Sequence, residues 1–126
     1  NYRMPNINAA LGCAQLENLD KYVASKRKVA AEYIEHFKNV DGIDFFVEPE
    51  NTFSNYWLSA VVLKDKESQL DFLQQTNDNG VMTRPIWELM NHLPMFENCE
   101  NDGLKNTIWF ANRVVNIPSS IRLEDL

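Results

Sequence analysis

The sequence predicts an α+β domain in which a long N-terminal helix precedes a small, mostly antiparallel sheet with helices on one side. Apolar residues recur at three- and four-residue spacing through residues 6–39, which is typical of an amphipathic helix. Residues 56–63 form a nearly continuous run of aromatic, β-branched and small apolar residues, which predicts a central strand. The elements expected along the whole chain follow the order α-β-β-α-β-α-β.

The first helix is expected to run unbroken from about residue 6 to residue 39 and to bend, if anywhere, near Ser25. Asn6 follows a proline and is a favourable N-cap. Gly12 and several alanines make the first half of the helix narrow, so another backbone can approach it closely. Cys13 lies among these small residues and is expected to be a buried, inert thiol. The helix is long for so small a domain and should pack on something else.

The later elements are shorter and are bounded by turn residues such as Asp41-Gly42 and Asn79-Gly80. They are strand 43–47, helix 67–78, strand 81–84, helix 104–111 and strand 114–117. Pro85 cannot donate a hydrogen bond to a neighbouring strand, so the strand before it must end there or lie at a sheet edge. Ser119-Ser120 can cap a final helix near the end of the chain.

The 126 residues carry a net charge of −6, which argues against nucleic acid or an anionic membrane surface as a partner. Such partners require a clustered basic surface. Basic residues cluster only at Lys21, Lys26, Arg27 and Lys28, all on one expected helix, where we interpret them as a solvated face. No apolar run is long enough to span a bilayer.

Cys13 and Cys99 match neither a metal-ligand spacing nor a CxxC pair. This pattern indicates a reducing, cytoplasmic location. The N-terminus shows no secretory signal pattern. The chain opens on Asn1 in the middle of a motif, and we interpret it as a fragment of a longer protein.

The sequence predicts no catalytic residue and no metal site. His36 and His92 lie far apart and are not accompanied by ligands at metal-binding spacing. Ser119-Ser120 lacks the glycines of a nucleophile elbow. No glycine-rich phosphate loop is present. The chain is therefore expected to hold only part of an active site.

Residues 79–96 are the strongest candidate for ligand contacts, with Arg84, Trp87, Asn91 and His92. An Arg is almost never fully buried without a partner, so Arg84 is difficult to explain by packing. Two structural alternatives stay open. Trp87 and its apolar neighbours can belong to the core, and Arg84 can pair with a carboxylate such as that of Glu88.

Three segments resemble the DegT/DnrJ/StrS sugar aminotransferases, which are pyridoxal-phosphate enzymes. Residues 1–16 match that family's pattern Asn-x-Arg-Met…Ala-Ala-Leu-Gly…Gln-Leu. Thr83-Arg84-Pro85-Ile86-Trp87…Leu93-Pro94-Met95-Phe96 is the second match. Val115-Asn116-Ile117-Pro118-Ser119-Ser120 is the third and is similar to the family's closing Leu-Pro-Ser-Ser. The three segments run in the family's order and spacing.

The resemblance implies that residues 1–126 are the C-terminal small domain of the aspartate-aminotransferase fold, with 6–39 as the interdomain helix. The large domain, with its Schiff-base lysine, would be absent, and this fragment alone would be inactive. The full enzyme would be a homodimer that passes an amine, from glutamate, to a nucleotide-linked 4-keto-6-deoxy sugar. Residues 87–90 look most like the branch that acts on UDP-linked N-acetylhexosamines. The alternative is a non-catalytic binding or regulatory module.

The resemblance also assigns roles to single residues. Asn1 matches a residue that reaches across the dimer to the cofactor phosphate of the other subunit, and Arg3 matches the neighbouring Arg, which lies near the same phosphate or near the substrate. Arg84 and the loop with Trp87 match the wall beside the nucleotide-sugar. Many relatives have His where this chain has Asn91, and here His92 follows one position later.

Overall fold

The computed structural model describes residues 2–125 and confirms the α+β class. Asn1, one of the expected cofactor contacts, lies outside the described residues. The α-helices are α1 (Asn6–Leu16), α2 (Leu19–Phe37), α3 (Lys66–Asp78) and α4 (Lys105–Ala111). The strands are β1 (Ile43–Phe45), β2 (Ser59–Leu63), β3 (Arg84–Pro85) and β4 (Val114–Ile117). Single 3-10 turns are η1 (Met90–His92), η2 (Pro94–Phe96) and η3 (Leu123–Asp125).

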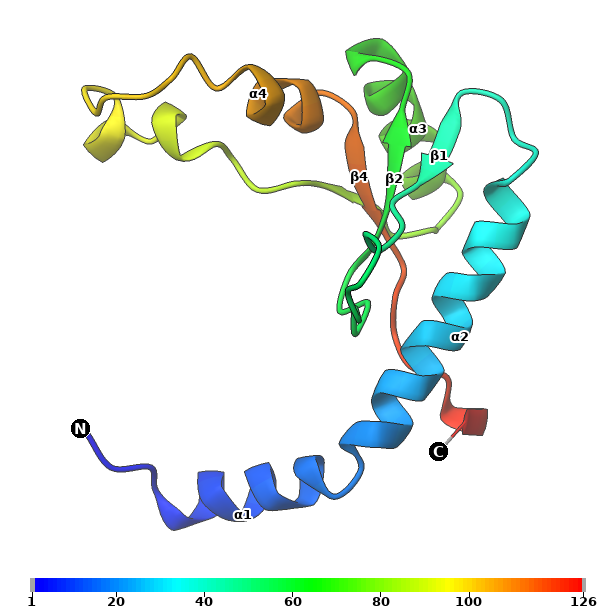
Figure 1. Ribbon diagram of the computed structural model, residues 1–126, viewed down its shortest axis with the longest axis vertical. Helices are drawn as coiled ribbons and strands as arrows, with labels where there is room; N and C mark the ends of the chain where they lie inside the picture. Colours follow the sequence, from blue (N-terminus) through cyan, green and yellow to red (C-terminus); the bar gives the residue numbers. More distant parts are fainter. Residues whose placement is uncertain (1, 126) are drawn as a thin grey trace.

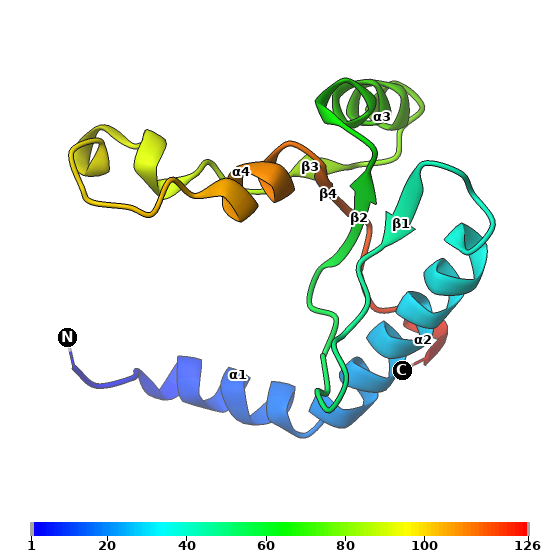
Figure 2. The ribbon, with the colours of Figure 1, turned by 45° about the horizontal axis from the view of Figure 1, so that its top comes forward.

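The four strands form one antiparallel sheet in the order β1-β2-β4-β3, so β2 is central as expected. One face of this sheet forms the core. Its buried side chains are Val61, Leu63, Val115 and Ile117. Tyr33 and Phe37 of α2 and Phe72 and Leu73 of α3 pack against them. The two longest helices therefore cover the same face (Figure 2), and the opposite face is left for α4, where Phe110 contacts Phe46.

The expected single helix over residues 6–39 is wrong, because the structure breaks it at residues 17 and 18. Asn18 leaves helical geometry, with φ −109° and ψ 2°. Its side-chain amide donates to the carbonyl of Ala14 at 3.0 Å, and its backbone N–H donates to that of Gln15. These bonds satisfy carbonyls at the end of α1, so the chain can turn before α2. No break occurs at Ser25, which is buried within α2.

α1 has no buried residue, and it projects away from the sheet to give the molecule a C-shaped outline (Figures 1 and 2). Ile7, Leu11 and Leu16 are all exposed. Cys13 is exposed as well, so the expectation of a buried thiol is wrong. Its small neighbours suit close packing, but no element of the described chain lies against α1.

Within residues 2–125, no helix is both long and apolar enough to cross a membrane.

Three predicted strands are shorter than expected, and the first of them, β1, ends at Phe45 rather than at residue 47. β2 begins only at Ser59, because Tyr56 takes the left-handed conformation with φ 44°. β3 covers 84–85 rather than 81–84, and it lies at the sheet edge as Pro85 requires. Thr83 is instead bonded to the end of α3, since its backbone carbonyl and hydroxyl accept from the amide of Asn77. The final helix after Ser119 is reduced to the turn η3.

The solvated face that the sequence indicated on α2 is only partly present, because Lys21 and Lys28 are exposed whereas Lys26 and Arg27 are half-buried and hydrogen-bonded. Arg27 forms a bidentate ion pair with Glu48 at 2.7 and 3.0 Å and also donates to the carbonyl of Ser54. Its guanidinium lies 4.0 Å from the ring centre of Phe53. Lys28 pairs with Asp125 at 2.8 Å. These contacts fasten α2 to the loop 46–58 and to the end of the described chain.

Gln69 joins three elements from inside the core. It is fully buried on α3, and its amide nitrogen donates to the carbonyls of Ala111 at 3.0 Å and Val114 at 2.8 Å. Its amide oxygen accepts from the ammonium of Lys66 at 2.7 Å. One side chain thus holds the end of α4 and the start of β4 against α3.

We predict that Gln69→Leu lowers the free energy of unfolding by about 2–4 kcal/mol, because one buried and one partly buried carbonyl lose their donor. Urea unfolding measures the change. Gln75→Leu, on the exposed side of the same helix, is the control and should shift stability by no more than about 0.5 kcal/mol. Equal effects for the two variants would contradict the role of Gln69.

We predict that part of the protein's stability is lost between about pH 4.5 and pH 2. The bonds from Arg27, together with the backbone N–H of Ser54, lower the pKa of Glu48 from 4.5 to about 2. A carboxyl with a lowered folded-state pKa stabilises above its unfolded pKa, and this stability disappears as the pH falls through the folded value. The melting temperature of Glu48→Gln should therefore fall less across this window than that of the native chain. Glu50→Gln, an exposed change in the same loop, should follow the native curve.

Candidate functional site

A groove of about 560 Å³ lies where β3 and β4 meet. It is lined by Leu58, Met82, Arg84, Pro85, Trp87, Asn116, Ile117, Pro118 and Ser119. The pairing of β3 with β4 sets Arg84 directly opposite Asn116. Residues opposite each other in a ladder project from the same face of a sheet. Both polar side chains therefore belong to the face that α2 and α3 leave uncovered.

Arg84 is exposed, and the one polar contact of its side chain among the described residues is the sulfur of Met82, at 3.5 Å. The alternative pairing with Glu88 is wrong. The carboxylate of Glu88 lies instead 2.6 Å from Nδ1 of His92. The guanidinium thus keeps its donors for a ligand, and a carboxylate or phosphate is the chemistry that it binds best.

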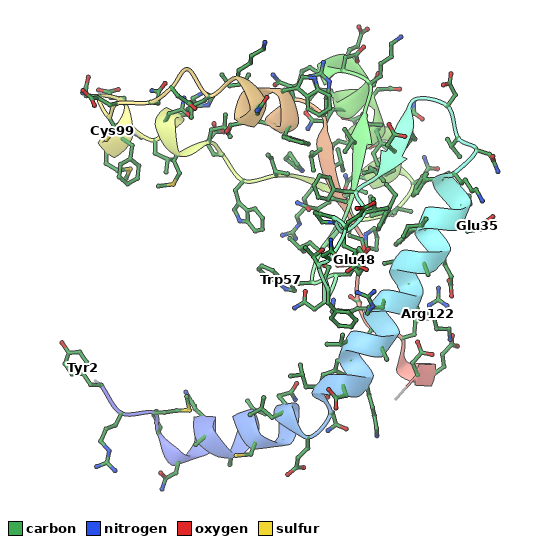
Figure 3. The ribbon with its side chains drawn as sticks, in the orientation of Figure 1. Tyr2, Glu35, Glu48, Trp57, Cys99 and Arg122 are labelled. Carbon is green, nitrogen blue, oxygen red and sulfur yellow. The ribbon has the colours of Figure 1, made fainter. Side chains whose placement is uncertain are left out.

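Trp87 lies at the surface, so the alternative that it belongs to the core is wrong. Its ring is close to that of Trp57, with ring centres 6.5 Å apart and planes inclined by 33°. Trp57 comes from the loop 46–58, on the side that faces α1 (Figure 3). The groove thus has an aromatic wall next to the charge of Arg84.

Lys26 connects the two sides of this site from α2. Its ammonium donates to the backbone carbonyls of Trp57 at 3.2 Å and Ser119 at 2.6 Å. The hydroxyl of Ser119 also donates to the carbonyl of Trp57, at 3.1 Å. Burial lowers the pKa of Lys26. This role could not be predicted from sequence, because the partners of Lys26 lie 31 and 93 residues away.

Asn116 was also missed as a candidate, although a signal was present. It is the single polar residue in the strand Val-Val-Asn-Ile, where the other three side chains are buried. A polar residue that interrupts an apolar strand marks the side chain that faces away from the core. Its amide lies 3.4 Å from the carbonyl of Pro85, across the ladder.

The other predicted contacts do not reach the groove. Residues 86–104, which we call the arm, leave the sheet after β3 and carry η1 with Asn91 and His92. Asn91 lines a separate, mostly apolar hollow of about 410 Å³ with Phe96 and Cys99. Arg3 is exposed ahead of α1. That end of the chain, marked by Tyr2 in Figure 3, lies across the open side of the molecule from the arm.

The groove can bind but cannot by itself attach pyridoxal phosphate covalently. No lysine is among its lining residues. Lys26 is connected to the groove only through hydrogen bonds, because its ammonium donates to the carbonyls of Trp57 and of the lining residue Ser119. In the described part of the chain, no group of three His, Cys, Asp or Glu side chains is arranged to hold a metal ion. What the site offers is a guanidinium, an amide and two indole rings.

Comparison with known proteins finds one family whose model matches nearly the whole chain. The model of the DegT/DnrJ/EryC1/StrS aminotransferase family matches residues 1–125. A GDP-perosamine synthase of Vibrio cholerae is 31% identical over 125 residues, which cover 94% of this chain and 33% of that protein. The chain therefore spans about a third of the length of this relative.

Solved structures share the fold at lower identity. PseC of Helicobacter pylori, described as an aminotransferase involved in the biosynthesis of pseudoaminic acid, superposes with a TM-score of 0.86 at 17% identity. The match covers 99% of this chain and 35% of PseC. DesV of S. venezuelae gives a TM-score of 0.83 at 21% identity and covers 98% and 34% of the two chains. The small antiparallel sheet with its helices is thus a known arrangement.

Proposed function

This chain belongs to the DegT/DnrJ/EryC1/StrS aminotransferase family, and we propose that residues 1–126 form the C-terminal small domain of a nucleotide-sugar aminotransferase. The family depends on pyridoxal phosphate, and the chain corresponds to a region of its nucleotide-sugar enzymes. The observation that carries the proposal is the groove, in which the guanidinium of Arg84 has no carboxylate partner among residues 2–125 and lies near the exposed indole ring of Trp87, which pairs with that of Trp57. Such a site suits an anionic ligand with ring systems.

The proposed reaction passes the amine of glutamate to the keto carbon of a nucleotide-linked 4-keto-6-deoxy sugar, with release of 2-oxoglutarate. Pyridoxal phosphate, when bound, carries the amine between the two substrates. The lysine that holds it is proposed to belong to a part of the enzyme outside this chain. The UDP-linked N-acetylhexosamine branch is proposed from residues 87–90.

This chain's own residues are proposed to bind and orient. Arg84 holds the nucleotide-sugar by charge-assisted hydrogen bonds, and Trp87 lies against it. Asn91 and His92, on the arm and away from the groove, are proposed to contact a more distant part of the same nucleotide-sugar. Asn1 and Arg3 are proposed to reach the cofactor phosphate of a partner subunit, so that the enzyme works as a homodimer. The exposed apolar residues of α1 support such packing.

The alternative is a non-catalytic binding or regulatory module, in which the same groove would hold a ligand without turnover. The two functions differ in turnover. We predict that the full-length protein converts glutamate to 2-oxoglutarate only with a nucleotide-linked keto sugar, and that mass spectrometry finds the amino sugar. The 126-residue chain alone should convert neither substrate. Binding without turnover by the full-length protein would instead support the module.

We predict that Arg84→Ala in the full-length protein raises KM for the nucleotide-sugar by about tenfold to a hundredfold. A hydrogen bond to a charged group contributes about 1.5–3 kcal/mol, and this one would serve a single substrate. KM for glutamate should change little. Steady-state kinetics with each substrate varied in turn, together with a melting curve, make the measurement.

Arg113→Ala is the matched control. Arg113 donates to the carbonyl of Lys64 and lies over the ring of Trp109, outside the groove. Its loss should lower the melting temperature and leave the ratio of the two KM values unchanged. The same pattern in Arg84→Ala, a destabilised fold with both substrates affected alike, would reject the role of Arg84 in binding.

A further inference from the structure

The indole rings of Trp57 and Trp87 are both exposed to solvent at the groove. Trp57 is 66% exposed and Trp87 is 69% exposed, although the rings lie at a distance typical of aromatic pairs. They come from separate segments, the loop 46–58 and the chain just after β3. A large aromatic surface that is assembled from two segments and left uncovered is typical of a contact site.

The backbone of Trp57 is fixed, and its exposed ring lies next to that of Trp87. Its N–H donates to the side chain of Asn55 at 2.9 Å. Its carbonyl accepts from both Lys26 and Ser119. The pair of Arg27 with Glu48 holds the rest of the loop. A ring that is positioned before binding loses little conformational entropy when it meets a ligand.

We propose that Trp57 and Trp87 form a platform on which the nucleobase of the ligand stacks, that Arg84 binds the adjoining diphosphate, and that Lys26 is a positioning residue for Trp57. The identity of the ligand rests on the proposed function. A nucleoside diphosphate carries both a flat π system and a dense negative charge, whereas glutamate has no ring. Stacking on an aromatic side chain tolerates any base, because every base has a π face.

Calorimetry on the full-length protein tests the platform with UDP, GDP, dTDP and inorganic pyrophosphate as probes. Trp57→Ala should weaken binding of the three nucleotides by about tenfold to a hundredfold, the range expected for loss of a stacked base. Pyrophosphate affinity should not change. Trp57→Phe should restore most of the loss, and Arg84→Ala should weaken all four probes. Trp109→Ala, on α4 and outside the groove, is the control and should alter none.

Lys26→Met tests the positioning role, because it keeps most of the stem and removes both hydrogen bonds. It should weaken nucleotide binding in the manner of Trp57→Ala and leave pyrophosphate binding intact, and Lys26→Arg should recover part of the loss. A merely structural lysine would lower the melting temperature and weaken pyrophosphate and nucleotides equally. That result would overturn the role of Lys26.

The platform is overturned if Trp57→Ala leaves nucleotide affinity unchanged, if it weakens pyrophosphate to the same extent, or if none of the four probes binds the native protein. These outcomes are separate from those of the proposed function, since calorimetry needs no turnover. A protein that binds UDP through Trp57 without transferring an amine would reject the aminotransferase and keep the platform. Amine transfer by the native protein, together with unaltered UDP binding in Trp57→Ala, would support the aminotransferase and reject the platform.

Discussion

The cationic residues of α2 hold the structure together away from the sheet. The strands are short, and the loop 46–58 has no ladder of its own to fix it. Arg27 supplies that restraint through a bidentate pair with Glu48, and Lys26 extends it to Trp57 and Ser119. Partly buried, hydrogen-bonded pairs of this kind restrain a loop more firmly than exposed ones, because solvent screens them less. The shape of the groove thus depends on a helix that does not line it.

The asymmetry of the sheet explains where the groove lies. Both α2 and α3 pack on the face with Val61 and Val115, and Gln69 fixes α4 and β4 from the same side. The opposite face keeps Arg84 and Asn116 at the surface, on paired strands. Stability and ligand contact are therefore assigned to opposite faces, so a change on the open face can alter binding without disturbing the core.

Local signals in the sequence predicted the elements that depend on local bonds. Helix α3 and strand β4 were placed to within a residue, because the turn residues Asn79-Gly80 follow α3 and Pro118 follows β4. The break at Asn18 was missed, since the apolar stripe continues across it and the bonds that end α1 leave no mark on periodicity. The partners of Lys26 are remote in sequence and so could not be predicted. Asn91 and His92 follow Arg84 closely in sequence, yet the arm carries them away from the sheet.

The C-shaped outline constrains how the predicted contacts can act together. The end of the chain with Arg3 lies beyond α1, and Arg84 lies on β3 at the sheet (Figures 1 and 2). One copy of this chain, as folded here, does not bring the two guanidinium groups to one ligand. If both serve a single active site, at least one of them must act on a surface supplied by another copy or another domain. The exposed apolar residues of α1 lie on the element that connects these two ends, so burying them against such a surface would also fix the position of Arg3. The same packing that stabilises the helix would then complete the site.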